Sequence, residues 1–138
     1  METLVKTNII ITIIRIINVH IGDRECVIKA NTREYGDVDI YFEDVWECRY
    51  CIENAGIIRW ERFQRSDELE GSIFEVHNSD YLRYFVCQTD GTLPSDNLKD
   101  YLLSDEIDTI FEVISVGHII QLHTLSRYCA NWCFFWLH

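Results

Sequence analysis

Residues Val38 to Ile52 alternate between apolar and polar side chains almost without interruption. Because successive side chains of a β-strand point to opposite faces, this pattern predicts a long or bent strand with one apolar, inward face. Asp44 is the one acid on the apolar side, and a bulge or turn near Glu43–Asp44 would explain it. The predicted inward positions are the even-numbered ones: Val38, Ile40, Phe42, Trp46, Cys48, Tyr50 and Ile52.

The odd-numbered positions of the same stretch carry mostly carboxylates around one tyrosine. Five acids lie between Asp37 and Glu47, and no lysine or arginine separates them. A row of negative charge on an outward face suits a basic protein partner, and tyrosine is enriched at the energetic centres of interfaces. The candidate partner-binding residues are therefore Asp37, Asp39, Tyr41, Glu43 and Glu47, with Asp105, Glu106 and Asp108 as a second patch at a loop.

The net charge of −11 comes entirely from the middle of the chain. Residues 34–112 hold 20 acids and 6 bases, a net −14, whereas the two flanks together hold 3 acids and 6 bases, a net +3. A field of this sign repels nucleic acid and anionic membranes and attracts basic proteins. The alternative interpretation is that the acidity only keeps a small domain soluble. The run of five acids without a base favours a dedicated surface.

The length and composition predict one domain spanning residues 1–138, with enough apolar material for a core. Hydrophobic residues make up 48% of the chain, which excludes the disordered class. The apolar run Ile9–Ile14 is too short to cross a bilayer, and no signal-peptide cleavage site follows it. We therefore expect a cytoplasmic protein whose six cysteines are reduced and mostly buried.

Further segments have the composition of strands. Residues Ile9–Val19 are rich in β-branched side chains, which predicts a strand buried on both faces. Leu98–Leu103 is ambiguous, because Ser95 and Asp96 could cap a short helix. We favour a hairpin with Thr109–Ser115. The other predicted strands are Glu25–Ala30, Ser72–His77, Tyr81–Cys87 and Val116–His123.

Many short strands with turn signals every eight to twelve residues predict a mainly β fold. We expect an antiparallel sandwich or barrel-like domain, with an α+β arrangement as the alternative. From Thr124 the apolar residues recur at helical spacing, which predicts a short C-terminal helix. The aromatic block Tyr128–Trp136 is expected to close the core. If it cannot all be buried, it predicts a homodimer contact or a hydrophobic ligand groove.

One arrangement of cysteines resembles a zinc site: Cys48-x2-Cys51 together with Cys129-x3-Cys133. The strand pattern argues against it, because an odd separation sends Cys48 and Cys51 to opposite faces. A dyad of Cys87 with His77 is conceivable if the two lie on neighbouring strands, but no oxyanion-binding glycine loop accompanies it. We therefore predict a non-enzymatic protein without a metal or cofactor.

The order of four segments along the chain is similar to the order found in a known group of proteins. The segments are Ile40–Trp46, Ile52–Ala55, Asn78–Leu82 and Ile107–Val113. This order resembles small bacterial immunity proteins, the cytoplasmic antidotes of polymorphic or contact-dependent toxins. The resemblance covers residues 38–115. It implies a partner that is a toxin domain, often a nuclease and therefore basic.

The leading hypothesis is thus an inhibitor that binds and neutralises a basic toxin domain, most often a nuclease. A protein that mimics nucleic acid to block a defence system would use the same electrostatics. A different class is a carrier whose β-rich shell encloses a small molecule or lipid, with the aromatic residues lining its pocket. A thiol- or zinc-dependent enzyme is a third hypothesis, which metal analysis of the protein would test.

Overall fold

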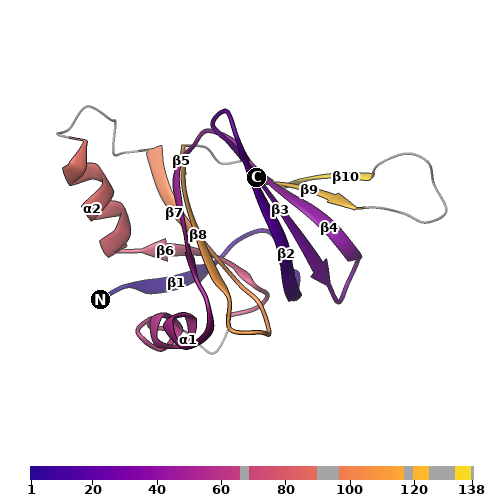
Figure 1. Cartoon of the computed structure of the whole chain (residues 1–138), viewed down its shortest axis with the longest axis horizontal. Helices are drawn as coiled ribbons and strands as arrows, with labels where there is room; N and C mark the ends of the chain where they lie inside the picture. Colours follow the sequence, from indigo (N-terminus) through magenta and orange to yellow (C-terminus); the bar gives the residue numbers. More distant parts are fainter. Residues whose placement is uncertain (66–68, 90–96, 117–119, 125–132, 138) are drawn as a thin grey trace.

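A computed structural model describes residues 1–65, 69–89, 97–116, 120–124 and 133–137. The described residues form ten strands and two helices. The strands make two antiparallel five-stranded sheets that pack face to face (Figure 1). The predicted mainly β, antiparallel sandwich is therefore confirmed.

The first sheet is built around the predicted hairpin of Leu98–Leu103 with Thr109–Ser115, which is confirmed as β7–β8. Its strand order is β1-β6-β7-β8-β5. The strands are β1 (Thr3–Lys6), β6 (Ile73–His77), β7 (Leu98–Ser104), β8 (Ile110–Val116) and β5 (Val45–Cys51).

The second sheet has β2 at one edge. The prediction that Ile9–Val19 forms a strand buried on both faces is therefore wrong. Most residues of this edge strand are exposed, and Ile17 is 43% exposed. Two register shifts interrupt its pairing with β3, and such bulges discourage edge-to-edge association. The order is β10-β9-β4-β3-β2, with β10 (Cys133–Leu137), β9 (Ile120–Thr124), β4 (Gly36–Phe42), β3 (Glu25–Thr32) and β2 (Ile13–Gly22).

The core lies between the inward faces of the two sheets. Val38, Ile40 and Phe42 of β4 are at most 2% exposed and pack in the same cluster as Val113 and Phe111 of β8. Burial at every second position is what the alternating sequence predicted for this half of the stretch.

The second half of the alternating stretch does not continue the same strand. At Asp44, whose φ is 48°, the chain leaves the second sheet and enters the first as β5. A register shift between Val45 and Glu47 interrupts the pairing of β5 with β8. Trp46, Tyr50 and Ile52 are 38%, 48% and 53% exposed, so their predicted burial is wrong. The predicted inward orientation holds for Cys48, which packs against the core, and for Tyr50, which pairs with Phe111 and contacts its ring. The predicted turn near Glu43–Asp44 is confirmed.

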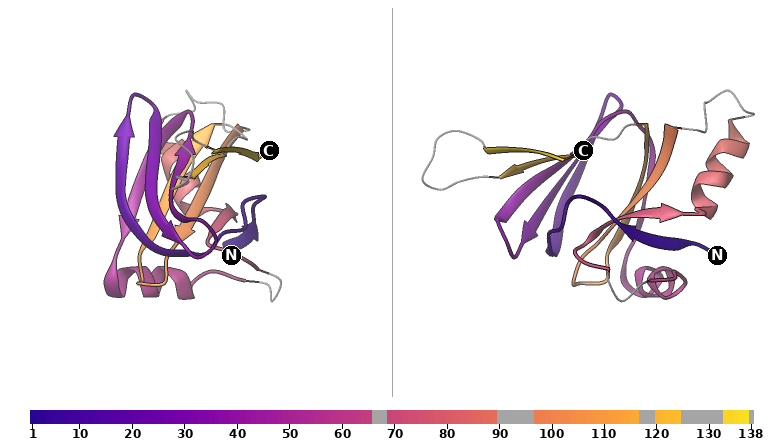
Figure 2. Two further views of the ribbon diagram at one scale, coloured as in Figure 1. Left: turned by 90° about the vertical axis from the view of Figure 1, so that its right-hand side faces the viewer. Right: turned by 180° about the vertical axis from the view of Figure 1, so that it is seen from behind.

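Two helices lie on the side of the first sheet that faces away from the second sheet (Figure 2). They are α1 (Glu53–Glu61) and α2 (Asp80–Gln88). The prediction of a strand over Tyr81–Cys87 is wrong, because Ser79 caps a helix by accepting a hydrogen bond from the Leu82 N–H at 2.9 Å. Tyr81, Leu82, Phe85 and Val86 recur at helical spacing and pack on Leu98 and Ile114.

The predicted C-terminal helix is wrong where the structure describes that segment. Residues Cys133–Leu137 form β10, which pairs with β9. Residues 125–132, which include Tyr128 and Trp132 of the aromatic block, lie outside the described residues. The predicted role of the block as core closure, homodimer contact or ligand groove stays a prediction.

Candidate functional site: an acidic end and a buried ionic cluster

Two turns from distant parts of the sequence lie side by side at one end of the sandwich, at the top of Figure 1. One joins β2 to β3 and the other joins β4 to β5. The N–H of Val45 donates a hydrogen bond to the carbonyl oxygen of Arg24 at 2.9 Å, which fixes the two turns to each other. The N–H of Val116 donates to the Asp44 carbonyl at 2.9 Å and attaches the second turn to β8.

These turns gather exposed carboxylates that the sequence keeps apart. We call the group the acidic end, and its members are Asp23, Glu25, Glu43 and Asp44, all exposed. Arg24 is the only base in the two turns, and its guanidinium carbon lies 4.1 Å from the centroid of the Trp46 ring. The acidic end therefore combines a net negative charge with a partly exposed tryptophan, which is a composition that favours binding of a basic protein surface.

Tyr41 borders the acidic end on the outer face of β4. A hydrogen bond with Glu25, burial, and the charges of Glu25 and Glu43 raise the pKa of Tyr41 to about 12. The phenol is thus neutral at physiological pH. Its ring stacks on His123 of β9, with the centroids 6.1 Å apart and the planes 3° from parallel.

The predicted row of charges is only partly continuous. Asp37, Asp39 and Tyr41 do share the outer face of β4. However, Asp37 accepts a hydrogen bond from the Asn31 side chain at 2.9 Å, and Asp39 lies opposite Lys29 in the neighbouring strand. Glu47 is on β5 in the other sheet, where its charge acts on Tyr81 of α2. The expectation that these residues form a single row is therefore wrong at Glu47.

The second predicted patch lies at the turn between β7 and β8, and two of its acids have partners within the chain. Asp105 accepts hydrogen bonds from the N–H groups of Ile107 and Thr109, both at 2.9 Å, and from that of Ile16 at 3.2 Å. Glu106 forms an ion pair with Arg33 at 2.6 Å. Asp105 is therefore a structural residue of the turn, and Glu106 attaches it to the β3–β4 connection.

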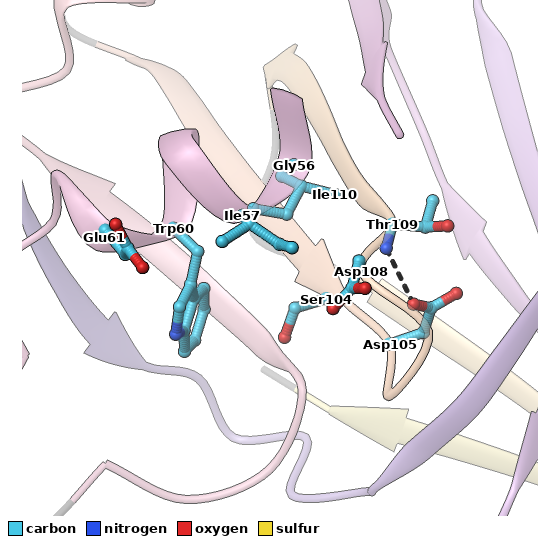
Figure 3. A pocket seen from close by; sticks show the side chains of 9 residues that line it. All are labelled: Gly56, Ile57, Trp60, Glu61, Ser104, Asp105, Asp108, Thr109 and Ile110. Atoms are coloured by element: carbon cyan, nitrogen blue, oxygen red, sulfur yellow. Dashed lines mark hydrogen bonds between the residues drawn. The ribbon is translucent and has the colours of Figure 1, made fainter. Parts of the chain in front are cut away.

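A groove of about 310 Å³ is lined by residues of this turn and of α1. Figure 3 shows its wall of Ile57, Trp60 and Ile110, and the hydrogen bond that turns Asp105 toward Thr109. Asp108 and Glu61 contribute exposed carboxylates to its lining. A second groove of about 390 Å³ runs along α2, beside Leu82 and Val86. Both grooves are outside the core between the sheets.

An ionic cluster is buried between the first sheet and the two helices. Glu112 of β8 accepts hydrogen bonds from Arg59 of α1, with Nε 3.0 Å from Oε1, and from Arg49 of β5, with Nη2 3.0 Å away. Arg59 also holds Glu2, with Nη1 2.6 Å from Oε2. The other oxygen of Glu2 accepts the N–H of Asp80 at 2.9 Å. The N-terminal segment, α1 and the start of α2 are thus joined through charges.

Asp100 of β7 completes this cluster, in surroundings that favour its protonated form. Burial and the charge of Glu112 raise the pKa of Asp100 well above its usual range. Burial acts to raise the pKa of Glu112 as well, but hydrogen bonds from Asp100 and Arg59 outweigh it and lower that pKa. Asp100 Oδ2 accepts a hydrogen bond from the Ser79 hydroxyl at 2.7 Å. A proton on the other oxygen can then be donated to Glu112.

Asp100→Asn tests this assignment. The pKa of Asp100 is higher in the folded than in the unfolded protein, so its stabilising effect is complete at acid pH and is lost as the pH rises. The amide removes that dependence and can still donate to Glu112. We expect urea denaturation to show the variant at least as stable as the wild type at neutral pH, with an advantage that shrinks toward pH 4. A variant less stable by several kcal/mol at neutral pH would contradict a neutral Asp100.

Sequence reasoning missed the contribution of Asp23 and Glu25 to the acidic end, and it missed the buried cluster. One signal was present: Asp100 and Glu112 are single acids inside otherwise apolar strands, where an unpaired charge is costly. Their partners could not be identified, because Glu2, Arg59 and Glu112 are far apart in the sequence.

The cysteines considered for a zinc site or a catalytic dyad lie on several different elements. Cys48 and Cys51 lie on β5, Cys133 begins β10 in the other sheet, and Cys129 lies outside the described residues. Cys87 is on α2 instead of a strand beside His77, whose imidazole lies 3.5 Å from Glu75. Within the described ranges, no group of three or more His, Cys, Asp or Glu side chains is arranged to hold a metal ion.

Comparisons with known proteins give no relative: no family model matches the chain, and neither the curated proteins nor the solved structures contain a significant match. None of the helices in the described part of the chain has the length and apolar character needed to span a membrane.

Proposed function

We propose that this protein is a non-enzymatic inhibitor that binds a basic protein through its acidic end. In its most specific form, the proposal is a cytoplasmic bacterial immunity protein that neutralises a toxin domain, most often a nuclease. The observation that supports it is the convergence of Asp23, Glu25, Glu43 and Asp44 beside Trp46 and Tyr41, on two turns that a backbone hydrogen bond fixes together.

The physical argument concerns both rate and specificity. Exposed carboxylates increase the encounter rate with a cationic surface, and they suppress binding to anionic ones. Tyrosine and tryptophan supply contact area that can be desolvated at the centre of an interface. A nuclease that binds phosphates with arginine and lysine offers the complementary surface, and an inhibitor seated there excludes the substrate.

The acidic end has a second favourable property, which is that it is held in place before binding. Val45 is tied to the β2–β3 turn, and Asp44 to β8, by backbone hydrogen bonds of 2.9 Å. A preformed surface loses less conformational entropy on association than a mobile loop does. In the second patch, by contrast, Asp105 is held by backbone N–H groups and Glu106 by Arg33.

The test is neutralisation of the acidic end by Asp23→Asn, Glu25→Gln, Glu43→Gln and Asp44→Asn together. Asparagine tolerates the positive φ at position 44, so the fold should be retained. The neighbouring genes are searched for a toxin domain, and a basic domain found there is the binding partner to use. We expect stopped-flow mixing to show an association rate at least about tenfold lower than that of the wild type, and a weaker dependence on salt. Co-expression should no longer protect cells from the toxin.

The matched control is Glu61→Gln with Asp108→Asn, which removes two exposed carboxylates at the opposite end of the sandwich. It should associate at nearly the wild-type rate. An association rate that is equally fast from low to high salt would refute the electrostatic proposal. A defect confined to the control variant would show that the acidic end is not the binding surface.

A further inference from the structure

Two cysteines from different sheets contribute their side chains to the main core close to the acidic end. Cys26 follows Glu25 on β3, and Cys48 follows Glu47 on β5. Cys26 is fully buried in the main core cluster, and the partly buried Cys48 packs against that cluster. The hydrogen bond from Val45, the first residue of β5, to Arg24, which directly precedes β3, lies two or three residues from each cysteine.

We infer that Cys26 and Cys48 are a modification site, at which a peroxide converts the two thiols into a reversible disulfide between the sheets. Geometry supports the pairing, because both side chains pack in the same core cluster and the two thiols are hydrogen-bonded to each other. None of the chemistry assigned to the acidic end uses these thiols, and the inference does not depend on the proposed function.

The two thiols differ in a way that assigns their roles. The hydrogen bond from Cys26 lowers the pKa of Cys48, although burial and the charge of Glu47 oppose this. The same hydrogen bond, together with burial, raises the pKa of Cys26. Cys48 is therefore the sulfur that ionises more readily and is also the more accessible one, which makes it the nucleophile. Cys26 is the resolving thiol.

The reaction balances with hydrogen peroxide as the oxidant. The Cys48 thiolate attacks one peroxide oxygen, the O–O bond breaks, and Cys48 sulfenic acid forms with release of hydroxide, which is protonated to water. The Cys26 sulfur then attacks the Cys48 sulfur. The S–S bond forms, the S–O bond breaks, and the leaving hydroxide takes the Cys26 proton. Overall, two thiols and one peroxide give one disulfide and two waters, and a dithiol reductant reverses the oxidation.

The experiment treats the full-length protein with hydrogen peroxide and maps its peptides by mass spectrometry without reduction. We expect one linked pair of peptides, containing Cys26 and Cys48, with a mass lower by two hydrogen atoms. The bond closes a loop of about 20 residues, so Tm should rise by about 10 °C and return to its starting value after reduction. Cys48→Ser and Cys26→Ala should each lose both effects.

Cys87→Ser is the matched control, because Cys87 is an exposed thiol on α2. It should retain the crosslink and the increase in Tm. Linkage of other cysteines, or oxidation that stops at Cys48 without joining Cys26, would overturn the inference. A Tm that does not rise in the crosslinked wild type would show that the native sheets do not accommodate the bond. The wild-type peptide map alone decides the pairing if a variant fails to fold.

Discussion

Arg59→Met should lower the free energy of unfolding by about 3–5 kcal/mol at neutral pH, the usual cost of leaving a buried charge without its partner. The Arg59 side chain is 14% exposed, and the carboxylates it contacts, on Glu2 and Glu112, are 7% and 1% exposed. Methionine fills similar space but donates no hydrogen bonds. Among the described residues, Glu112 would keep Arg49 as its one ion-pair partner, and Glu2 would lose its ion pair. Urea denaturation of the two proteins measures the difference.

The loss of stability caused by Arg59→Met should become smaller as the pH falls. Arg59 helps lower the pKa of Glu112 in the folded protein, so the stabilisation it provides exists above the unfolded pKa of 4.5 and is lost as the pH falls through the folded value. In the variant, Glu112 can take up a proton at a higher pH. We therefore expect the curves of stability against pH for the two proteins to approach each other below about pH 4.5.

Arg62→Met is the control, because Arg62 ends the same helix and is exposed. Its effect should stay within about 0.5 kcal/mol. If Arg59→Met fell within the same limit at neutral pH, the ionic cluster would not contribute to stability in the way its geometry indicates.

Gly56→Ala should destabilise the protein by about 1–3 kcal/mol, although alanine is the better helix former by about 1 kcal/mol. A Cβ at this position of α1 would collide with the carbonyl oxygen of Asp108 and would lie 3.2 Å from that of Cys51. Both obstacles are backbone atoms, so they cannot rotate away. The helix would have to move from the β7–β8 turn. Thermal denaturation should show a lower Tm.

Asn54→Ala is the matched control on the same helix, at an exposed position. It should change stability by no more than about 0.5 kcal/mol. A Gly56→Ala variant that is more stable than the wild type would show that the turn shifts freely and that the close contact is not required for the fold.

The local sequence pattern was sufficient to predict alternate burial within one strand and the pairing of two strands joined by a short turn. Val38, Ile40 and Phe42 are buried as their alternation predicted, and the β7–β8 hairpin formed where its apolar segments indicated. The segment Tyr81–Cys87 shows the limit of this reasoning, because its apolar residues fit both a strand and a helix. The capping hydroxyl of Ser79 and the packing surface of Leu98 and Ile114 favour the helix.

The predicted row of carboxylates shows a different limit of reasoning from sequence. The alternation continues past Glu43–Asp44, but the chain crosses to the other sheet there, so a count of odd and even positions no longer gives a single face. What replaces the predicted single row is the acidic end, where Asp23 and Glu25 join Glu43 and Asp44. The hydrogen bond between Val45 and Arg24 that assembles it links residues 21 positions apart.

The sequence by itself determined the β-rich class, the acidic middle of the chain and the turn at Glu43–Asp44, because these depend on composition and on the two-residue period of a strand. Only the tertiary structure decided which carboxylates are neighbours, which charges are buried and which thiols meet. Those outcomes depend on contacts between residues far apart in the chain, such as Glu2, Arg59 and Glu112, and no local pattern encodes them.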